Sequence, residues 1–183
     1  MVVELDRKAV VAARAGSVAD FTQLLKASDA KMRALTYRLL HDATAMDDVL
    51  QSAYLKAYRG FAAFRGEAGF ESWLYQIVYR TCLDHIRSAP ARKTETLHDH
   101  INDPPNSSDI ASTAVNRISV DRALRSLPVD QRAAVWLVDG AGYSFEQAAE
   151  ILDARPGTIA SRVSRGRASL RTSLALTPKE SYR

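Results

Sequence analysis

The sequence predicts an all-α protein made of two small helical bundles joined by a flexible linker, with a helix-turn-helix in the second bundle. Three observations predict this fold class. Apolar residues recur at helical spacing in both halves of the 183-residue chain, with almost no strand-like alternation. Between residues 88 and 112 this pattern stops, in a stretch that holds three of the six prolines and many Ser, Asn and Asp residues. Near the C-terminus, two short helical patterns are separated by a tight turn.

Composition narrows the possible functions. A hydrophobic content of 46% suffices for packed cores, and a net charge of +4 makes the chain mildly basic. Five arginines and no acidic residue lie between Arg155 and Arg171, a local patch that suits a polyanion. Cys82 is the single cysteine, which excludes an internal disulfide and a thiolate zinc site. No apolar run reaches membrane-spanning length and no signal peptide is recognisable, so we expect a cytoplasmic protein.

The first predicted domain covers residues 1–88 and contains four helices. Each helix is marked by apolar residues at a spacing of three and four. At the start of the first helix there are polar side chains that can cap it. The predicted helices begin at Ser17 or Asp20 and at about Asp29, and then span residues 45–61 and 70–87.

The third of these helices has an unusual outer face. Its predicted buried stripe consists of Leu50, Ala53, Tyr54, Ala57, Tyr58 and Phe61. The opposite face consists of Asp48, Gln51, Ser52, Leu55 and Arg59. Leu55 is therefore an apolar residue on a polar face. Either it is a singly exposed leucine, which is common, or it is the anchor of a protein–protein contact.

The fourth helix is apolar almost all round and follows a loop with two glycines, two aromatic residues and an arginine, at residues 62–70. Its remaining polar strip consists of Trp73, Gln76, Arg80, Asp84 and Arg87. Such a loop can stack on unpaired bases. The alternative is that Phe64, Phe70 and Trp73 fasten the loop to the bundle, and for these aromatics individually packing is favoured.

The predicted linker covers residues 89–112 and contains His98 and His100. Two histidines could join a metal site, but no cysteine or third histidine stands near them. We expect solvent-exposed histidines, and the sequence predicts neither a metal site nor a cofactor.

The second predicted domain covers residues 113–183, with helices near residues 115–127, 130–139, 144–152 and 156–174. The third of them begins at Ser144, which forms a predicted capping box with Gln147. Its expected buried face consists of Phe145, Ala148, Ala149 and Leu152.

The last helix begins with Pro156, which suits a first helical turn, and it buries Ile159 and Val163. Its predicted solvent face consists of Thr158, Ser161, Arg162, Arg165 and Arg167, with Arg155 just ahead. Short hydroxyl groups followed by arginines are what a helix in a DNA major groove requires. The alternative is an arginine-rich solvated helix at the edge of a domain.

Several stretches resemble bacterial sigma factors. Residues 47–59, 64–66, 70–77 and 84–87 resemble region 2, and residues 123–132 together with the helix-turn-helix resemble region 4. The two-domain length resembles the extracytoplasmic-function group. The resemblance implies a promoter-specificity subunit, not an enzyme, whose partners are core RNA polymerase, promoter DNA and an anti-sigma factor.

The resemblance also implies roles for individual residues. The surface for core polymerase would consist of Asp48, Gln51, Ser52, Leu55 and Arg59. The −10 element and DNA melting would involve Phe64, Arg65, Gly66, Phe70, Trp73, Gln76, Arg80, Asp84 and Arg87. The −35 element would be read by Arg155, Thr158, Ser161, Arg162, Arg165 and Arg167.

Three positions depart from the family pattern. Arg80 stands where asparagine is usual, and it can reach a phosphate but cannot present the same compact donor and acceptor pair. Asp153 replaces the usual turn glycine, in a conformation that aspartate tolerates less readily than glycine. Ala160 replaces a basic residue that often contacts DNA.

Two other function classes are alternatives. A helix-turn-helix regulator would bind duplex DNA without polymerase. An enzyme on a helical bundle would need a ligand pocket with strongly perturbed titrating groups. The sequence offers no nucleophile with its base and no phosphate-cradling glycine loop.

Overall fold

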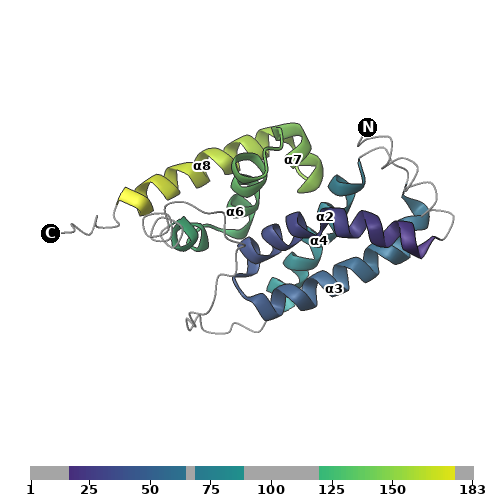
Figure 1. Cartoon of the computed structure of the whole chain (residues 1–183). Coiled ribbons are helices and arrows are strands. Elements are labelled where there is room, and N and C mark those ends of the chain that lie inside the picture. The colour runs from purple at the N-terminus through teal and green to yellow at the C-terminus, as the bar shows by residue number, and fades with distance from the viewer. Residues whose placement is uncertain (1–16, 65–68, 89–119, 176–183) are drawn as a thin grey trace, which may run out of the picture.

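The computed structural model describes residues 17–64, 69–88 and 120–175, and all regular structure in these residues is helical (Figure 1). The predicted linker, with His98 and His100, lies outside the described residues. The first bundle contains α2 (Val18–Leu40), α3 (Ala43–Gly60), a 3-10 turn (Phe61–Ala63) and α4 (Phe70–Ser88). The second bundle contains a helical segment at 120–125, α6 (Val129–Val135), a π-helical turn (Trp136–Gly140), α7 (Phe145–Ile151) and α8 (Pro156–Ala175).

Helix α2 is continuous, so the prediction of two helices in this stretch is wrong. Ser17 caps its N-terminus, as predicted, by accepting a hydrogen bond from the Asp20 amide at 3.3 Å. Asp29 lies inside this helix rather than at the start of a new one, and its carboxylate accepts a hydrogen bond from the Tyr54 hydroxyl at 2.8 Å. The helix ends at His41, which adopts a left-handed conformation with φ 53°.

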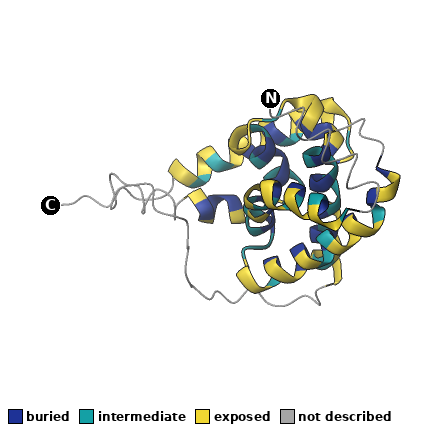
Figure 2. Ribbon diagram, turned by 45° about the vertical axis from the view of Figure 1, so that its right-hand side comes forward, coloured by how far each residue is buried: buried dark blue, intermediate teal, exposed yellow. Residues whose placement is uncertain are grey.

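The first bundle packs α2, α3 and α4 around one apolar core. Met32, Leu35 and Leu74 are completely buried in it. Tyr58, predicted to be buried, is instead 48% exposed. Its ring makes an edge-on contact with Phe21, with centroids 5.3 Å apart, and the rest of the side chain stays open to solvent. Figure 2 shows the buried residues on the sides of the helices that face one another.

In the second bundle, the predicted capping box between Ser144 and Gln147 is confirmed. Ile159 and Val163 are buried under α8, as predicted, but Phe145 is 36% exposed, so the prediction that it belongs to the core is wrong. Phe145 is the first residue of α7, and its side chain lines an open groove along α8 instead of packing in the core. Helices α6 and α8 approach so closely at Gly166 that an added Cβ would lie 2.6 Å from a Val135 methyl.

The two bundles are in contact. Helix α4 packs against α7, and α2 packs against α6 (Figure 1). Tyr75 and Tyr79 of α4 therefore belong to the same buried cluster as Leu137 and Ile151 of the second bundle. In the part of the chain described, no helix is both long enough and apolar enough to cross a membrane.

Candidate functional site

The outer face of α3 matches the sequence prediction. Leu55 is 52% exposed, among the large apolar side chains that the fold leaves open to solvent. Asp48, Gln51 and Arg59 are exposed on the same helix, and Ser52 is half-buried. The apolar side chain thus stands in a polar surround, as the anchor of a protein contact would.

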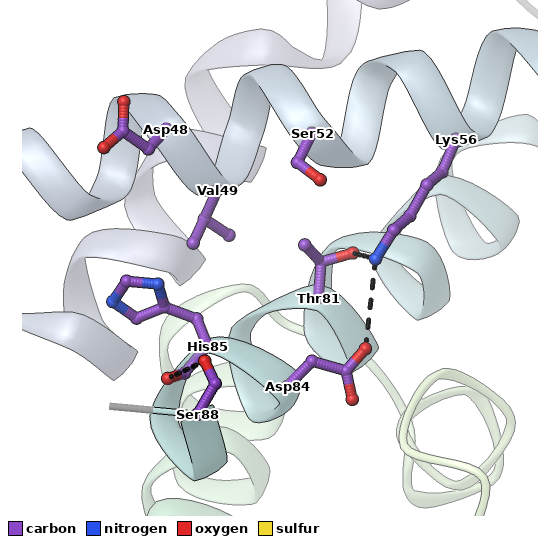
Figure 3. A pocket seen from close by; sticks show the side chains of 8 residues that line it. All are labelled: Asp48, Val49, Ser52, Lys56, Thr81, Asp84, His85 and Ser88. Carbon is purple, nitrogen blue, oxygen red and sulfur yellow. Dashed lines mark hydrogen bonds and ion pairs between the residues drawn. The ribbon is translucent and has the colours of Figure 1, made fainter. Parts of the chain in front are cut away.

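A groove of about 290 Å³ runs between α3 and α4 (Figure 3). It brings Asp48 and Ser52, predicted to bind polymerase, onto the same surface as Asp84, predicted to face the −10 element. Between them, the Lys56 ammonium donates a hydrogen bond to Thr81 at 3.3 Å and lies 3.9 Å from the Asp84 carboxylate. The sequence did not predict Lys56 as a site residue. Its position on the polar side of α3 could have indicated that it belongs to this surface.

The aromatic residues around the predicted melting loop pack against one another. Phe64 and Phe70 are 5% and 8% exposed. Phe64 lies over Trp73 with ring centroids 4.9 Å apart and stacks on Phe61 at 5.5 Å. These aromatics fasten both ends of the loop to the bundle, as the packing interpretation predicts. Arg65 and Gly66 lie outside the described residues.

The polar strip of α4 meets the helix-turn-helix. The Gln76 amide donates to the Glu150 carbonyl at 2.8 Å, and the Arg80 guanidinium pairs with Asp153 at 3.0 Å. Trp73 is half-buried. Asp84 and Arg87, at the far end of the strip, are exposed, and their ion-pair partners among the described residues lie within the first bundle.

Arg162 is the predicted site residue of α8 whose surroundings the sequence did not predict. It was predicted to face solvent, but its side chain is only 21% exposed and pairs with Asp130 of α6 at 2.8 Å. Asp130 also accepts the Tyr79 hydroxyl of α4 at 3.4 Å. Burial, followed by the nearby Asp130 charge, raises the pKa of Tyr79 to about 12, so this hydroxyl remains a donor at neutral pH.

The other residues predicted to contact DNA at or near α8 are all exposed to solvent. They are Arg155, Thr158, Ser161, Arg165 and Arg167. Arg165 donates to the Ser161 hydroxyl one turn earlier at 2.7 Å, and Arg167 forms a two-pronged pair with Asp139, the shorter contact being 2.5 Å. Both arginines are thus exposed, and these partners belong to the second bundle.

Sequence reasoning missed a polar cluster at the C-terminal end of α2. Arg132 of α6 donates to the Leu39 carbonyl at 2.9 Å and to the Leu127 carbonyl at 2.8 Å, joining the two bundles. Arg38 pairs with Asp121 at 3.0 Å. His41 lies beside them, where burial and the Arg132 charge lower its pKa to about 4. No local signal pointed to this cluster because its partners lie 83 to 94 residues apart in the chain.

Comparisons with known proteins cover both bundles. Residues 24–92 match the family described as Sigma-70 region 2, and residues 117–170 match Sigma-70, region 4. The chain is 39% identical over 165 residues to the ECF RNA polymerase sigma factor SigM of Mycobacterium tuberculosis, covering 90% of this chain and 82% of the relative. It is 29% identical over 178 residues to the RNA polymerase sigma-H factor of Pseudomonas aeruginosa, covering 91% and 92%.

Among solved structures, the fold is similar to the sigma factor RpoE of Bartonella quintana in complex with the anti-sigma factor NepR. The TM-score is 0.71 with 27% identity, covering 88% of this chain and 100% of that one. Because the superposition covers most of the chain, the similarity extends across both bundles.

Proposed function

This chain belongs to the extracytoplasmic-function group of sigma-70 factors, and we propose how its described surfaces divide the work of a promoter-specificity subunit. The first bundle binds core RNA polymerase through the outer face of α3 and the −10 element through α4. The second bundle reads the −35 element through α8. The observation that carries the proposal is the open face of α8, where exposed Thr158 and Ser161 precede exposed Arg165 on a helix entered by a tight turn.

The surface for core polymerase centres on Leu55. An apolar side chain that is 52% exposed among polar neighbours becomes a favourable contact only when a partner removes it from water. The groove between α3 and α4 continues this surface toward Asp84, so one partner can contact both helices (Figure 3). This continuity supports polymerase binding and −10 recognition on adjoining surfaces.

The −10 element is assigned to the polar strip of α4, with the aromatic cluster at the adjoining loop as its rigid support. Gln76 can hydrogen-bond a base, and Arg80 can hold a phosphate. In place of a stacking role, we assign Phe64 and Phe70 to holding the loop, because both are buried.

We assign RNA synthesis to the polymerase and no catalytic step to the chain itself. We place the action of this chain in the cytoplasm, together with the polymerase. A regulator that acts without polymerase is not favoured, because the family match includes region 2 as well as region 4. Since the Bartonella quintana sigma factor was solved with an anti-sigma factor, we assign an anti-sigma protein as a further partner of this chain.

The test is in-vitro transcription with purified core polymerase and the full chain, on promoter templates selected by the holoenzyme. We expect specific transcripts only when the chain is present. Leu55→Asp should weaken core binding by about 2 kcal/mol or more, because it places a charge in a desolvated contact, while leaving the fold intact.

Val120→Asp is the matched control, because Val120 is a comparably exposed apolar residue, at 43%, in the second bundle. It should bind core polymerase like the unaltered chain. Equal binding by Leu55→Asp and Val120→Asp would remove Leu55 from the polymerase surface.

A further inference from the structure

An ion pair joins two residues that lie in different bundles and depart from the family pattern. Arg80 of α4 and Asp153, in the turn before α8, are 73 residues apart in the sequence, and their side chains meet at 3.0 Å. Asp153 holds a left-handed conformation with φ 51°, where glycine is the least strained residue. A glycine at this position could adopt the turn but could not form the ion pair.

The contacts around this ion pair cover the middle of the α4 strip. Gln76 donates to the Glu150 carbonyl at the end of α7. The Tyr143 hydroxyl donates to Glu71 near the start of α4, and the Tyr143 ring packs edge-on against Tyr75 with centroids 5.5 Å apart. From Glu71 to Arg80, polar groups of α4 are therefore matched by groups of the second bundle.

A second contact, at the end of α2, holds the same two bundles together. Arg132 donates to two successive carbonyls at the C-terminus of α2, those of Arg38 and Leu39, at 3.4 and 2.9 Å. The Arg38 guanidinium lies over the Trp136 ring, 5.2 Å from its centroid. Two separate contacts fix the orientation of one bundle on the other better than either would alone.

We propose that the free chain adopts this closed arrangement as a built-in mask, in which the helix-turn-helix covers the −10-facing strip of α4 and the Asp153 carboxylate occupies the place at Arg80 that a DNA phosphate takes after opening. The recognition helix α8 stays uncovered in the closed arrangement. The assignment of α4 to the −10 element rests on the proposed function, whereas the closure itself does not.

The contacts differ in what they contribute to the closed arrangement. The side chains of Arg80 and Asp153 are 61% and 78% exposed, so their ion pair is weak, salt-sensitive and easily replaced by a phosphate. The ring contact of half-buried Tyr143 with buried Tyr75 does not depend on salt and holds the closed arrangement together. A polyanion can therefore compete for Arg80 while the apolar contact sets how often the chain opens.

The test measures the distance between the bundles in the full chain, with spin labels at Lys26→Cys and Ser169→Cys, both exposed positions. Cys82 is buried and its thiol pKa is raised to about 12 by burial, so it stays unlabelled. Without DNA or polymerase we expect one dominant short distance. A broad distribution dominated by long distances would overturn the proposal.

Variants identify the contacts responsible for closure. Asp153→Asn keeps a residue type that tolerates a left-handed turn but removes the charge, and Arg80→Gln removes its partner. Each should raise the population of long distances about two- to five-fold, and the double variant no further. Tyr143→Ala should raise it about ten-fold or more. Arg33→Gln is the matched control, because it breaks a similar exposed ion pair, with Asp47, inside the first bundle.

Unchanged distances in Asp153→Asn, Arg80→Gln and Tyr143→Ala alike would overturn the proposal. Binding of a short, mixed-sequence single-stranded DNA separates closure from masking. Asp153→Asn should bind this DNA more tightly than the unaltered chain, and Arg33→Gln should not. If the distances change as expected but DNA binding does not, the masking claim is overturned and α4 is not the DNA-facing helix, whereas the closure stands.

Discussion

The two helices assigned to promoter DNA differ in their surroundings. On α4, Gln76 and Arg80 contact the second bundle, whereas on α8 the partners of Arg165 and Arg167 among the described residues are Ser161 and Asp139 of their own bundle. A ligand can reach the arginines of α8 without any movement of one bundle on the other, whereas a ligand at Arg80 must displace Asp153 of the other bundle. We therefore expect −35 recognition to be available in the free chain and −10 recognition to require opening.

Breaking the contact at the end of α2 should have the largest effect. Arg132→Met removes the charged donors that cap Arg38 and Leu39, and we expect a loss of about 2–3 kcal/mol in the free energy of unfolding. Urea denaturation followed by circular dichroism measures this loss. Arg122→Met, at an exposed arginine of the same bundle, serves as the control and should change stability little. Equal stabilities would show that the Arg132 contact does not hold the bundles together.

Acid should weaken the same contact. Because burial lowers the pKa of His41 from 6.5 to about 4, the folded chain favours neutral imidazole, so stability is complete above pH 6.5 and declines as the pH falls toward 4. Arg132, Arg125 and Arg38 oppose protonation, and Asp121 favours it. We expect His41 to account for about 3 kcal/mol of the loss over this range.

His41→Asn isolates this effect, because asparagine also tolerates the left-handed conformation at this position. The free energy of unfolding of this variant should fall less between pH 7 and pH 4 than that of the unaltered chain. Parallel pH profiles would mean that His41 does not report on the contact.

A substitution inside the second bundle should lower stability by less, without disturbing the interface between the bundles. In Gly166→Ala the new methyl group meets Val135 at 2.6 Å, which costs stability, while alanine gains helix propensity, so we expect a net loss of about 1 kcal/mol. The distance between spin labels on the two bundles should stay that of the unaltered chain. If Gly166→Ala instead lengthens this distance, the α6–α8 packing and the interface are not independent.

The smallest effects should come from the open face of α8. Arg167→Ala should weaken binding of the holoenzyme to all promoters about equally and reduce the salt dependence by about one counterion, because we assign the exposed Arg167 guanidinium to the DNA backbone rather than to a base. Binding across a salt series on native and −35-scrambled promoters measures both quantities.

Arg162→Ala is the informative partner variant. Because Arg162 is tied to Asp130, its removal should also loosen the contact of Asp130 with Tyr79.

Local features of the fold were predictable, and contacts between distant segments were not. The capping box at Ser144 and the exposure of Leu55 follow from spacing and residue type within a few positions. The sequence also predicted that α4 is apolar almost all round, but spacing alone could not say which neighbour would cover Tyr75 and Tyr79. That neighbour comes from a segment more than fifty residues along the chain.

The errors have the same origin. Arg162 was predicted to face solvent because α8 alone gives it no partner, and Asp130 reaches it only when α6 folds back on α8. For Asp153, the sequence predicted the unusual position but not its partner. The sequence predicted an unusual residue for a left-handed turn, but only the folded chain supplies Arg80 as its partner.

Hydroxyl-radical footprinting of the tyrosines, read by mass spectrometry, tests most directly whether α4 is covered in the free chain. In the closed arrangement Tyr75 and Tyr79 are 1% and 4% exposed, while Tyr58 is 48% exposed. We predict slow modification of Tyr75 and Tyr79 and fast modification of Tyr58 in the free chain, with the rates at Tyr75 and Tyr79 rising when core polymerase is added. Modification of Tyr75 and Tyr79 in the free chain as fast as that of Tyr58 would contradict the account.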